Sequence, residues 1–195
     1  MYEAKSRLRK SLLIKRKKFF SDKFNFFHYK ILKIIRKNYK LKKNISVAGY
    51  YPVNFEANTL NILSKLSERG IIIGLPVITK NYRMMFKKWK PNQAMYLNKY
   101  GIPEPKKTNE TFKPDLVLVP LVGYDEKLNR LGYGAGYYDR ALKKLSAQKK
   151  IITIGIGFSF QKYNKIPANK NDYALDYVLN EKKMIYKKPK WKFYF

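Results

Sequence analysis

The chain has 195 residues, a formal net charge of +30 and no cysteine. Its length suits one domain whose core needs no disulfide, so we expect residues 1–195 to form a single domain. The lack of cysteine excludes a disulfide framework, a thiolate nucleophile and a cysteine-ligated zinc site. The basic amino terminus lacks the apolar stretch of a signal peptide, and no apolar run approaches the ~20 residues that span a bilayer, so we expect a cytoplasmic protein.

Two helices are expected at the amino terminus. Residues 2–20 have helical spacing of apolar residues, and Lys5 and Arg9 share one face of this helix. Such a pair can bind a phosphate chain, although cations four residues apart are more often only solvated. The second helix begins near Phe27 and carries His28, the only histidine, for which we see no catalytic partner.

A strand, a helix and a second strand follow at residues 45–51, 56–69 and 71–75, the last one ending at Pro76. The second strand is continuously apolar, which is typical of a parallel sheet covered on both faces. The three elements therefore predict a parallel βαβ unit within an α/β fold.

Tyr51 and Glu56 follow the first of these strands. Ligands of open α/β sheets bind beyond the carboxyl ends of the strands, so both residues lie where a substrate is expected. Glu56 has an alternative interpretation as a first-turn acid that stabilises the helix dipole.

Further strands are expected at the segments 83–89, 116–122, 151–156 and 174–179. The proline-rich segment 91–114 is interpreted as a loop that borders the site. Asp176 lies in the last strand, where it is either a magnesium ligand or a structural strand-end acid. Residues 182–195 form a basic tail that ends in aromatic residues.

The segment Arg130–Arg140 reads Arg-Leu-Gly-Tyr-Gly-Ala-Gly-Tyr-Tyr-Asp-Arg and follows an apolar strand. Its three glycines allow positive φ and close approach to a ligand, and residues 137–145 have helical spacing. A glycine turn before a helix start binds phosphate well, because free N–H groups and the helix dipole point at the anion. The segment fits neither the dinucleotide fingerprint nor the Walker loop.

Asp139 lies among the cations of this segment, beside Arg130 and Arg140. A carboxylate next to bound phosphates repels them unless a cation lies between, so Asp139 points to magnesium bound with a nucleotide. The alternative is a glycine-rich loop with an acid that only stabilises the helix dipole.

These motifs, in this order, resemble the 5-formyltetrahydrofolate cyclo-ligase family, also called 5,10-methenyltetrahydrofolate synthetases. The matching segments are Lys5–Arg9, Tyr51–Glu56, Leu75–Pro76, Met85–Phe86, Gly101–Pro105, Val119–Pro120, Arg130–Arg140, Gln161, Ile166–Pro167 and Asp172–Glu181. The resemblance implies a three-layer α/β/α fold with a mainly parallel sheet, of the CoA-transferase and ribose-phosphate-isomerase kind. It also implies that ATP phosphorylates the formyl oxygen of 5-formyltetrahydrofolate, after which N10 attacks the activated carbon and phosphate leaves.

The resemblance also implies roles for residues. Lys5 and Arg9 would contact ATP phosphates, and Asp139 and Asp176 would hold Mg²⁺. The ATP-binding turn would comprise Arg130, Leu131, Gly132, Tyr133, Gly134, Ala135, Gly136, Tyr137 and Tyr138, with Arg130 and Asp139 catalytic. The folate would contact Tyr51, Glu56, Tyr133, Gly134, Ala135, Gly136 and Tyr137.

The charge of +30 suggests a different class of function, a basic RNA-binding or ribosome-associated module. The lysines are spread through almost every segment, which favours a solvated basic surface over a dedicated nucleic-acid site. We therefore expect 5-formyltetrahydrofolate and ATP as partners of a monomeric enzyme, with no specific nucleic acid and no membrane. Another ATP-dependent ligase on the same scaffold is the remaining alternative.

Overall fold

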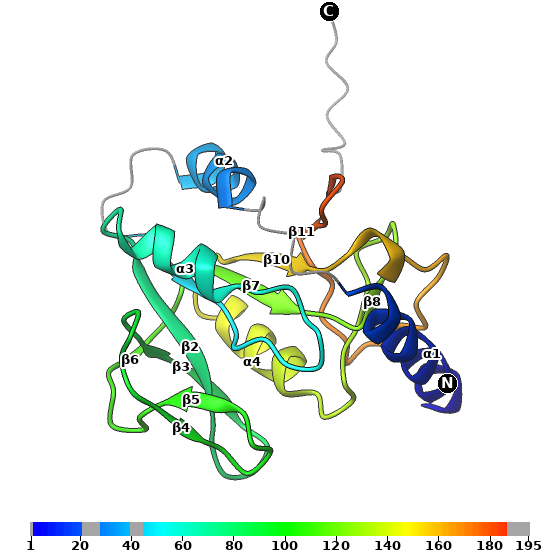
Figure 1. The fold of residues 1–195 in the computed structure, drawn as a ribbon, viewed down its shortest axis with the longest axis horizontal. Helices are drawn as coiled ribbons and strands as arrows, with labels where there is room; N and C mark the ends of the chain where they lie inside the picture. The colour runs from blue at the N-terminus through cyan, green and yellow to red at the C-terminus, as the bar shows by residue number, and fades with distance from the viewer. Residues whose placement is uncertain (1, 21–27, 40–44, 187–195) are drawn as a thin grey trace, which may run out of the picture.

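A computed structural model describes residues 2–20, 28–39 and 45–186 (Figure 1). The helices are α1 (Tyr2–Phe19), α2 (His28–Tyr39), α3 (Leu60–Ser67) and α4 (Tyr137–Ser146), with a 3₁₀ turn η1 (Ser159–Gln161). The strands are β1 (Ser46–Ala48), β2 (Ile72–Ile78), β3 (Met84–Lys88), β4 (Met95–Leu97), β5 (Pro103–Pro105), β6 (Thr111–Phe112), β7 (Leu116–Pro120), β8 (Gly123–Tyr124), β9 (Arg130–Leu131), β10 (Ile152–Ile156), β11 (Tyr177–Leu179) and β12 (Met184–Tyr186).

Eight of these strands form one sheet in the order β12-β11-β10-β7-β1-β2-β3-β6. The five central strands, from β11 to β2, are parallel, whereas β12, β3 and β6 pair antiparallel at the two sides. The unit β1-α3-β2 is the predicted βαβ crossover. Two short hairpins, β4-β5 and β8-β9, lie outside the main sheet.

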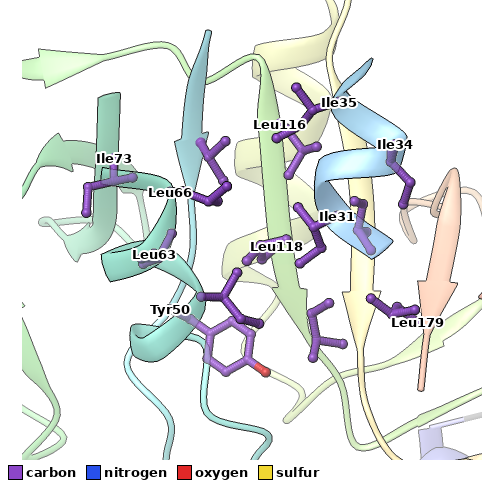
Figure 2. Close-up of a cluster of buried hydrophobic side chains, with 14 of the residues drawn as sticks. Ile31, Ile34, Ile35, Tyr50, Leu63, Leu66, Ile73, Leu116, Leu118 and Leu179 are labelled. Carbon is purple, nitrogen blue, oxygen red and sulfur yellow. The ribbon is translucent and has the colours of Figure 1, made fainter. Parts of the chain in front are cut away.

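Alternate residues of β7 point into two separate cores. Leu116 and Leu118 join a cluster with α2 and α3, and Val117 and Val119 join a cluster with α4. Figure 2 shows the first cluster, where side chains of α2 and α3 meet those of the sheet. Because successive strand residues face opposite sides, helices cover both faces of the sheet. This arrangement is the predicted three-layer α/β/α fold.

The helix α1 packs at one end of the sheet, beside the β8-β9 hairpin (Figure 1). Its Leu12 is buried in a small cluster with Val122, Leu131 and Ile166. This cluster is separate from both main cores, so α1 is held chiefly by the elements that border the carboxyl end of β7.

The expected helix over residues 56–69 begins later than predicted. It starts at Leu60, because Asn54 and Phe55 adopt positive φ of 49° and 63° and fold the preceding segment into an irregular loop. The Glu56 side chain accepts a hydrogen bond from the Val53 N–H at 3.0 Å within this loop. The interpretation of Glu56 as a first-turn helix acid is therefore wrong.

The strand that was expected to end at Pro76 continues to Ile78. Pro76 pairs with Phe86 of β3 but lies beyond Gly74, the last residue of β2 in register with β1. A missing N–H at this position therefore breaks no ladder bond to β1.

The proline-rich segment 91–114 is not a plain loop, because it contains the β4-β5 hairpin and β6. Glu104 of β5 is buried and accepts hydrogen bonds from the Ile78 N–H at 3.1 Å and the Asn98 amide at 3.2 Å. These contacts anchor the hairpin to the end of β2.

At the carboxyl terminus, β12 occupies part of the predicted tail and pairs with β11. Residues 187–195 and Phe27 lie outside the described residues. Within the described ranges, no helix is both long and apolar enough to cross a membrane.

Candidate functional site

The site is built on the glycine turn between β9 and α4. Gly134 and Gly136 have φ of 107° and 68°, a conformation that residues with a Cβ rarely adopt. Gly136 is the N-cap of α4, so the turn leads directly into the amino end of that helix. Sequence and structure agree on this element.

Two arginines from different helices hold the backbone of the turn. Arg9 Nε of α1 donates to the Gly132 carbonyl at 2.8 Å, and Arg140 Nη2 donates to the Ala135 carbonyl at 2.8 Å. A Cβ on Gly136 would lie 2.6 Å from Arg140 Nη1, so any larger residue there would displace the Arg140 guanidinium group. Two guanidinium groups therefore border a backbone segment suited to an anion.

Arg130 and Asp139 form an ion pair at the base of the turn, with 2.8 Å between Arg130 Nη2 and Asp139 Oδ1. The same Oδ1 accepts the Tyr173 N–H at 3.1 Å. Among the residues that the structure describes, both hydrogen bonds of the Asp139 carboxylate go to Oδ1, which leaves Oδ2 for a further cation. Arg130 also lies over the Tyr138 ring, with 5.5 Å from its Cζ to the ring centre.

Lys5 is brought to the same region by α1, where it forms an ion pair of 2.7 Å with Asp172. Lys5 and Arg9 thus share the face of α1 that lies against the carboxyl-terminal half of the chain. A phosphate bound by Lys5 would compete with Asp172 for the ammonium group.

Glu56 lies in a buried polar cluster that Tyr133 links to the turn, and 5% of its surface is exposed. Its Oε1 accepts the Tyr133 hydroxyl at 2.9 Å and lies 4.0 Å from Nη1 of Arg16. Arg16 also donates to the Tyr133 hydroxyl oxygen, and to the Leu121 carbonyl at 3.2 Å. The turn and the loop after β1 therefore meet through one hydrogen-bonded chain.

Burial raises the pKa of Glu56 to about 7, and this rise is opposed by the Val53 N–H, the Arg16 charge and the Tyr133 hydroxyl. Burial likewise raises the pKa of Tyr133 and of Tyr50, and the nearby Glu56 charge adds to both shifts. The cluster therefore holds a carboxyl group that gains or loses its proton near neutral pH.

Tyrosines from three elements gather at the open side of the turn. Tyr137 shares a hydroxyl contact of 3.0 Å with Tyr100, and its ring centre lies 6.1 Å from that of Tyr82. Lys99 lies over the rings of both Tyr82 and Tyr100, at 5.2 and 5.1 Å. Exposed aromatic rings beside cations suit a flat, anionic ligand.

Of the residues predicted from the sequence, the structure brings together Lys5, Arg9, Glu56, Asp139 and the turn. The turn residues are Arg130, Leu131, Gly132, Tyr133, Gly134, Ala135, Gly136, Tyr137 and Tyr138. Tyr51 lies half-buried in the loop after β1, near the sequence position of Glu56.

Asp176 lies elsewhere. Its Oδ2 accepts the Thr153 N–H and hydroxyl, both at 2.8 Å, at the beginning of β10 and β11. The glycine turn follows the opposite, carboxyl end of the parallel strands, so Asp176 is not brought to the turn. No group of three or more His, Cys, Asp or Glu side chains able to hold a metal occurs among the residues that the structure describes.

Arg16 and Tyr100 are site residues that sequence reasoning missed. Arg16 continues the helical spacing of Lys5, Arg9 and Leu12, and this signal was available but was obscured by the many cations around it. Tyr100 lies in the β4-β5 hairpin, whose short strands and prolines resemble a loop.

Fold and site together define an α/β protein with a glycine turn suited to an anion beside a buried carboxyl group. The model of the 5-formyltetrahydrofolate cyclo-ligase family matches residues 1–181. The chain belongs to this family and is an enzyme of the cyclo-ligase class.

Similar proteins agree with this assignment. A 5-formyltetrahydrofolate cyclo-ligase of Haemophilus influenzae is 33% identical over 141 residues, which cover 69% of this chain and 74% of the relative. The structure of Aquifex aeolicus 5,10-methenyltetrahydrofolate synthetase is 25% identical with a TM-score of 0.76, covering 98% of this chain and 96% of that one. The Mycoplasma pneumoniae synthetase gives 27% identity and a TM-score of 0.68, covering 91% and 99%. Family membership favours the ligase over the RNA-binding module.

Proposed function

We propose that this chain catalyses the ATP- and Mg²⁺-dependent cyclisation of 5-formyltetrahydrofolate to 5,10-methenyltetrahydrofolate, with release of ADP and phosphate. The observation that carries the proposal is the glycine turn, which is contacted by Arg9 and Arg140 and, through Tyr133, by the Glu56 cluster. One turn can thus bind a phosphate chain and a polar ring at the same time.

In the proposed reaction, the formyl oxygen attacks the γ-phosphorus of ATP and ADP leaves. N10 then attacks the activated formyl carbon and loses its proton, and the phosphate leaves with the former formyl oxygen. No protein nucleophile is needed, so catalysis consists of positioning and charge stabilisation. Arg130 is placed to stabilise charge on the transferring phosphoryl group, because Asp139 fixes its guanidinium at the base of the turn.

Magnesium bound through nucleotide phosphates needs only one or two protein carboxylates. Asp139 fits this requirement through Oδ2, since Oδ1 takes both of its hydrogen bonds. Bound there, Mg²⁺ would neutralise charge on the phosphates. Asp176 has no part in the proposed site because Thr153 holds it at the other end of the parallel strands.

The pterin ring of the folate has polar edges and flat faces. Glu56 offers a carboxylate to the ring N–H groups, and Tyr51 and Tyr137 offer aromatic surface nearby. Lys5 and Arg9 on α1 would contact the phosphates of ATP. The basic surface of the chain also attracts both anionic substrates.

The test is an absorbance assay with the purified protein, 5-formyltetrahydrofolate and Mg-ATP. We expect the near-ultraviolet absorbance of the methenyl product to rise. One ADP and one phosphate should form for each molecule of methenyl product. Reactions without ATP or without protein are the controls. An absence of product across a wide range of substrate concentrations would refute the proposal, and ATP binding without folate turnover would favour another ligase reaction.

A further inference from the structure

Arg16 is a cation in an unusual place. Its side chain is 1% exposed, although α1 presents most of its other lysines and arginines to solvent. Arginine is almost never fully buried without partners, because removal of a guanidinium group from water is costly. Its burial therefore implies specific partners for the guanidinium group.

The partners of Arg16 come from three parts of the chain. Nη1 donates to the carbonyl of Leu121 just after β7, and Nη2 donates to the hydroxyl of Tyr133 in the glycine turn. Nη1 also lies 4.0 Å from Glu56 Oε1 in the loop after β1. The Arg16 guanidinium carbon lies 5.6 Å from the centre of the Tyr133 ring. A single side chain thus connects α1, the turn and the carboxyl group.

The connection is not explained by packing alone. Nη1 donates to the Leu121 carbonyl and also faces Glu56 Oε1, and Nη2 donates to the Tyr133 hydroxyl, so both ends of the guanidinium group are directed at the cluster around Glu56. Arg16 Nε is buried and has no hydrogen-bond partner among the described residues. A buried cation with an unused donor beside a functional carboxylate indicates that charge is placed there for that carboxylate.

We propose that Arg16 is a positioning residue that favours the ionised form of Glu56 and orients its carboxylate to accept the N–H groups of the pterin ring. This inference rests on the proposed function, because it concerns how the same site recognises the folate. Arg16 acts through two paths, directly by its charge and indirectly through Tyr133, whose hydroxyl donates to Glu56 Oε1.

The charges that face Glu56 determine when it is ionised. Arg16 is the cation that lowers its pKa, whereas the tyrosines that face it are Tyr50 after β1, Tyr133 in the turn and Tyr138 on α4. None of these phenols ionises near neutral pH, because the nearby carboxylate and burial raise the pKa of each. Removal of Arg16 therefore raises the pKa of Glu56 further and leaves it protonated at neutral pH.

The experiment compares wild-type enzyme with Arg16→Met in steady-state turnover of 5-formyltetrahydrofolate across pH. Loss of a charge-assisted contact corresponds to a rise of roughly ten- to a hundredfold in the folate KM at neutral pH, with the ATP KM changed by less than about threefold. The rising limb of kcat/KM for folate should also move to higher pH. Arg69→Met, the same change at an exposed arginine of the α3 end, is the matched control and should behave as wild type.

A double-mutant cycle separates this role from a structural one. If Arg16 acts through Glu56, Arg16→Met should add little to the loss caused by Glu56→Gln, and the pH limb should be absent from both Glu56→Gln variants. A loss that is independent of pH, or that adds fully to that of Glu56→Gln, would overturn the inference. Wild-type enzyme that fails to turn over folate would instead refute the proposed function.

Two further variants keep the test decisive if Arg16→Met does not fold. Arg16→Lys retains the charge but cannot reach both the Leu121 carbonyl and the Tyr133 hydroxyl. The rising limb of its kcat/KM profile should therefore stay at the pH of the wild-type limb, while the folate KM should still rise. Tyr133→Phe removes only the hydroxyl link and should raise the folate KM and move the limb upward. Unchanged folate KM and pH limb in Tyr133→Phe would overturn the inference.

Discussion

The buried carboxyl group of Glu56 should make the stability of the apo protein fall as pH rises through neutrality. Its pKa is about 7 in the folded protein and 4.5 ordinarily. Below about pH 4.5 the group is protonated in both states and contributes no pH dependence. Between the unfolded pKa of 4.5 and the folded pKa of about 7, the folded state binds more protons than the unfolded state, so stability is lost as pH rises. This direction is opposite to that of an acid in a strong salt bridge.

The size of the effect follows from the two pKa values. Because a tenfold change in a protonation constant equals about 1.4 kcal/mol, a rise from 4.5 to about 7 costs the folded state about 3 kcal/mol once Glu56 is ionised. Most of this, about 2.5 kcal/mol, falls between about pH 5 and about pH 8. The penalty is large relative to the net stability of a domain of ordinary size.

Chemical denaturation of wild type and Glu56→Gln at matched pH values measures this effect. Glutamine does not titrate, so pH-independent consequences of the substitution appear as a constant offset between the two unfolding free energies. We expect wild type to lose about 2.5 kcal/mol relative to the variant between about pH 5 and about pH 8. A difference that is flat, or that grows in favour of wild type as pH rises, would refute the reasoning.

Two site variants and one fold variant give further predictions. Asp139→Ala should lower kcat roughly a hundredfold, because the charge of Asp139 acts through magnesium. The folate Kd, measured by direct binding, should change by less than about threefold. Equal losses in kcat and in folate affinity would contradict this role. Arg130→Ala should raise the ATP KM and lower kcat, and unchanged kinetics would remove Arg130 from the site. Gly74→Ala should destabilise the protein by at least about 2 kcal/mol in denaturant unfolding, since its Cβ would lie 2.3 Å from the Lys87 carbonyl. A loss well below this value would show that β2 and β3 move apart to accommodate the methyl group.

The features predicted correctly from the sequence are those coded by local pattern. The β1-α3-β2 unit follows from an apolar strand on each side of a helical repeat, and the glycine turn follows from glycines that permit positive φ. A parallel sheet covered on both faces follows from the continuously apolar segment 71–75, whereas the three-layer α/β/α fold was implied by the family resemblance.

The features missed depend on partners that are distant in sequence or on conformations that sequence does not mark. Asn54 and Phe55 take positive φ without glycine, so the late start of α3 had no local signal. The importance of Arg16 comes from contacts with residues 105 and 117 positions away, which no helical pattern contains. For Asp176 the sequence leaves a magnesium ligand and a structural strand-end acid open, and the hydrogen bond from Thr153 on a neighbouring strand favours the structural role.

The helix α1 has a consequence for how the enzyme matures on the ribosome. It is synthesised first, yet its side-chain hydrogen bonds are made with residues that emerge much later, at separations of 105 to 167 positions. We expect the strands β1, β2 and β7 to assemble while α1 still lacks its partners, because closing so long a loop is slow. A nascent chain that stops before residue 172 would then hold part of the sheet without the Lys5 contact, so catalytic competence should appear only when the last segment has been translated.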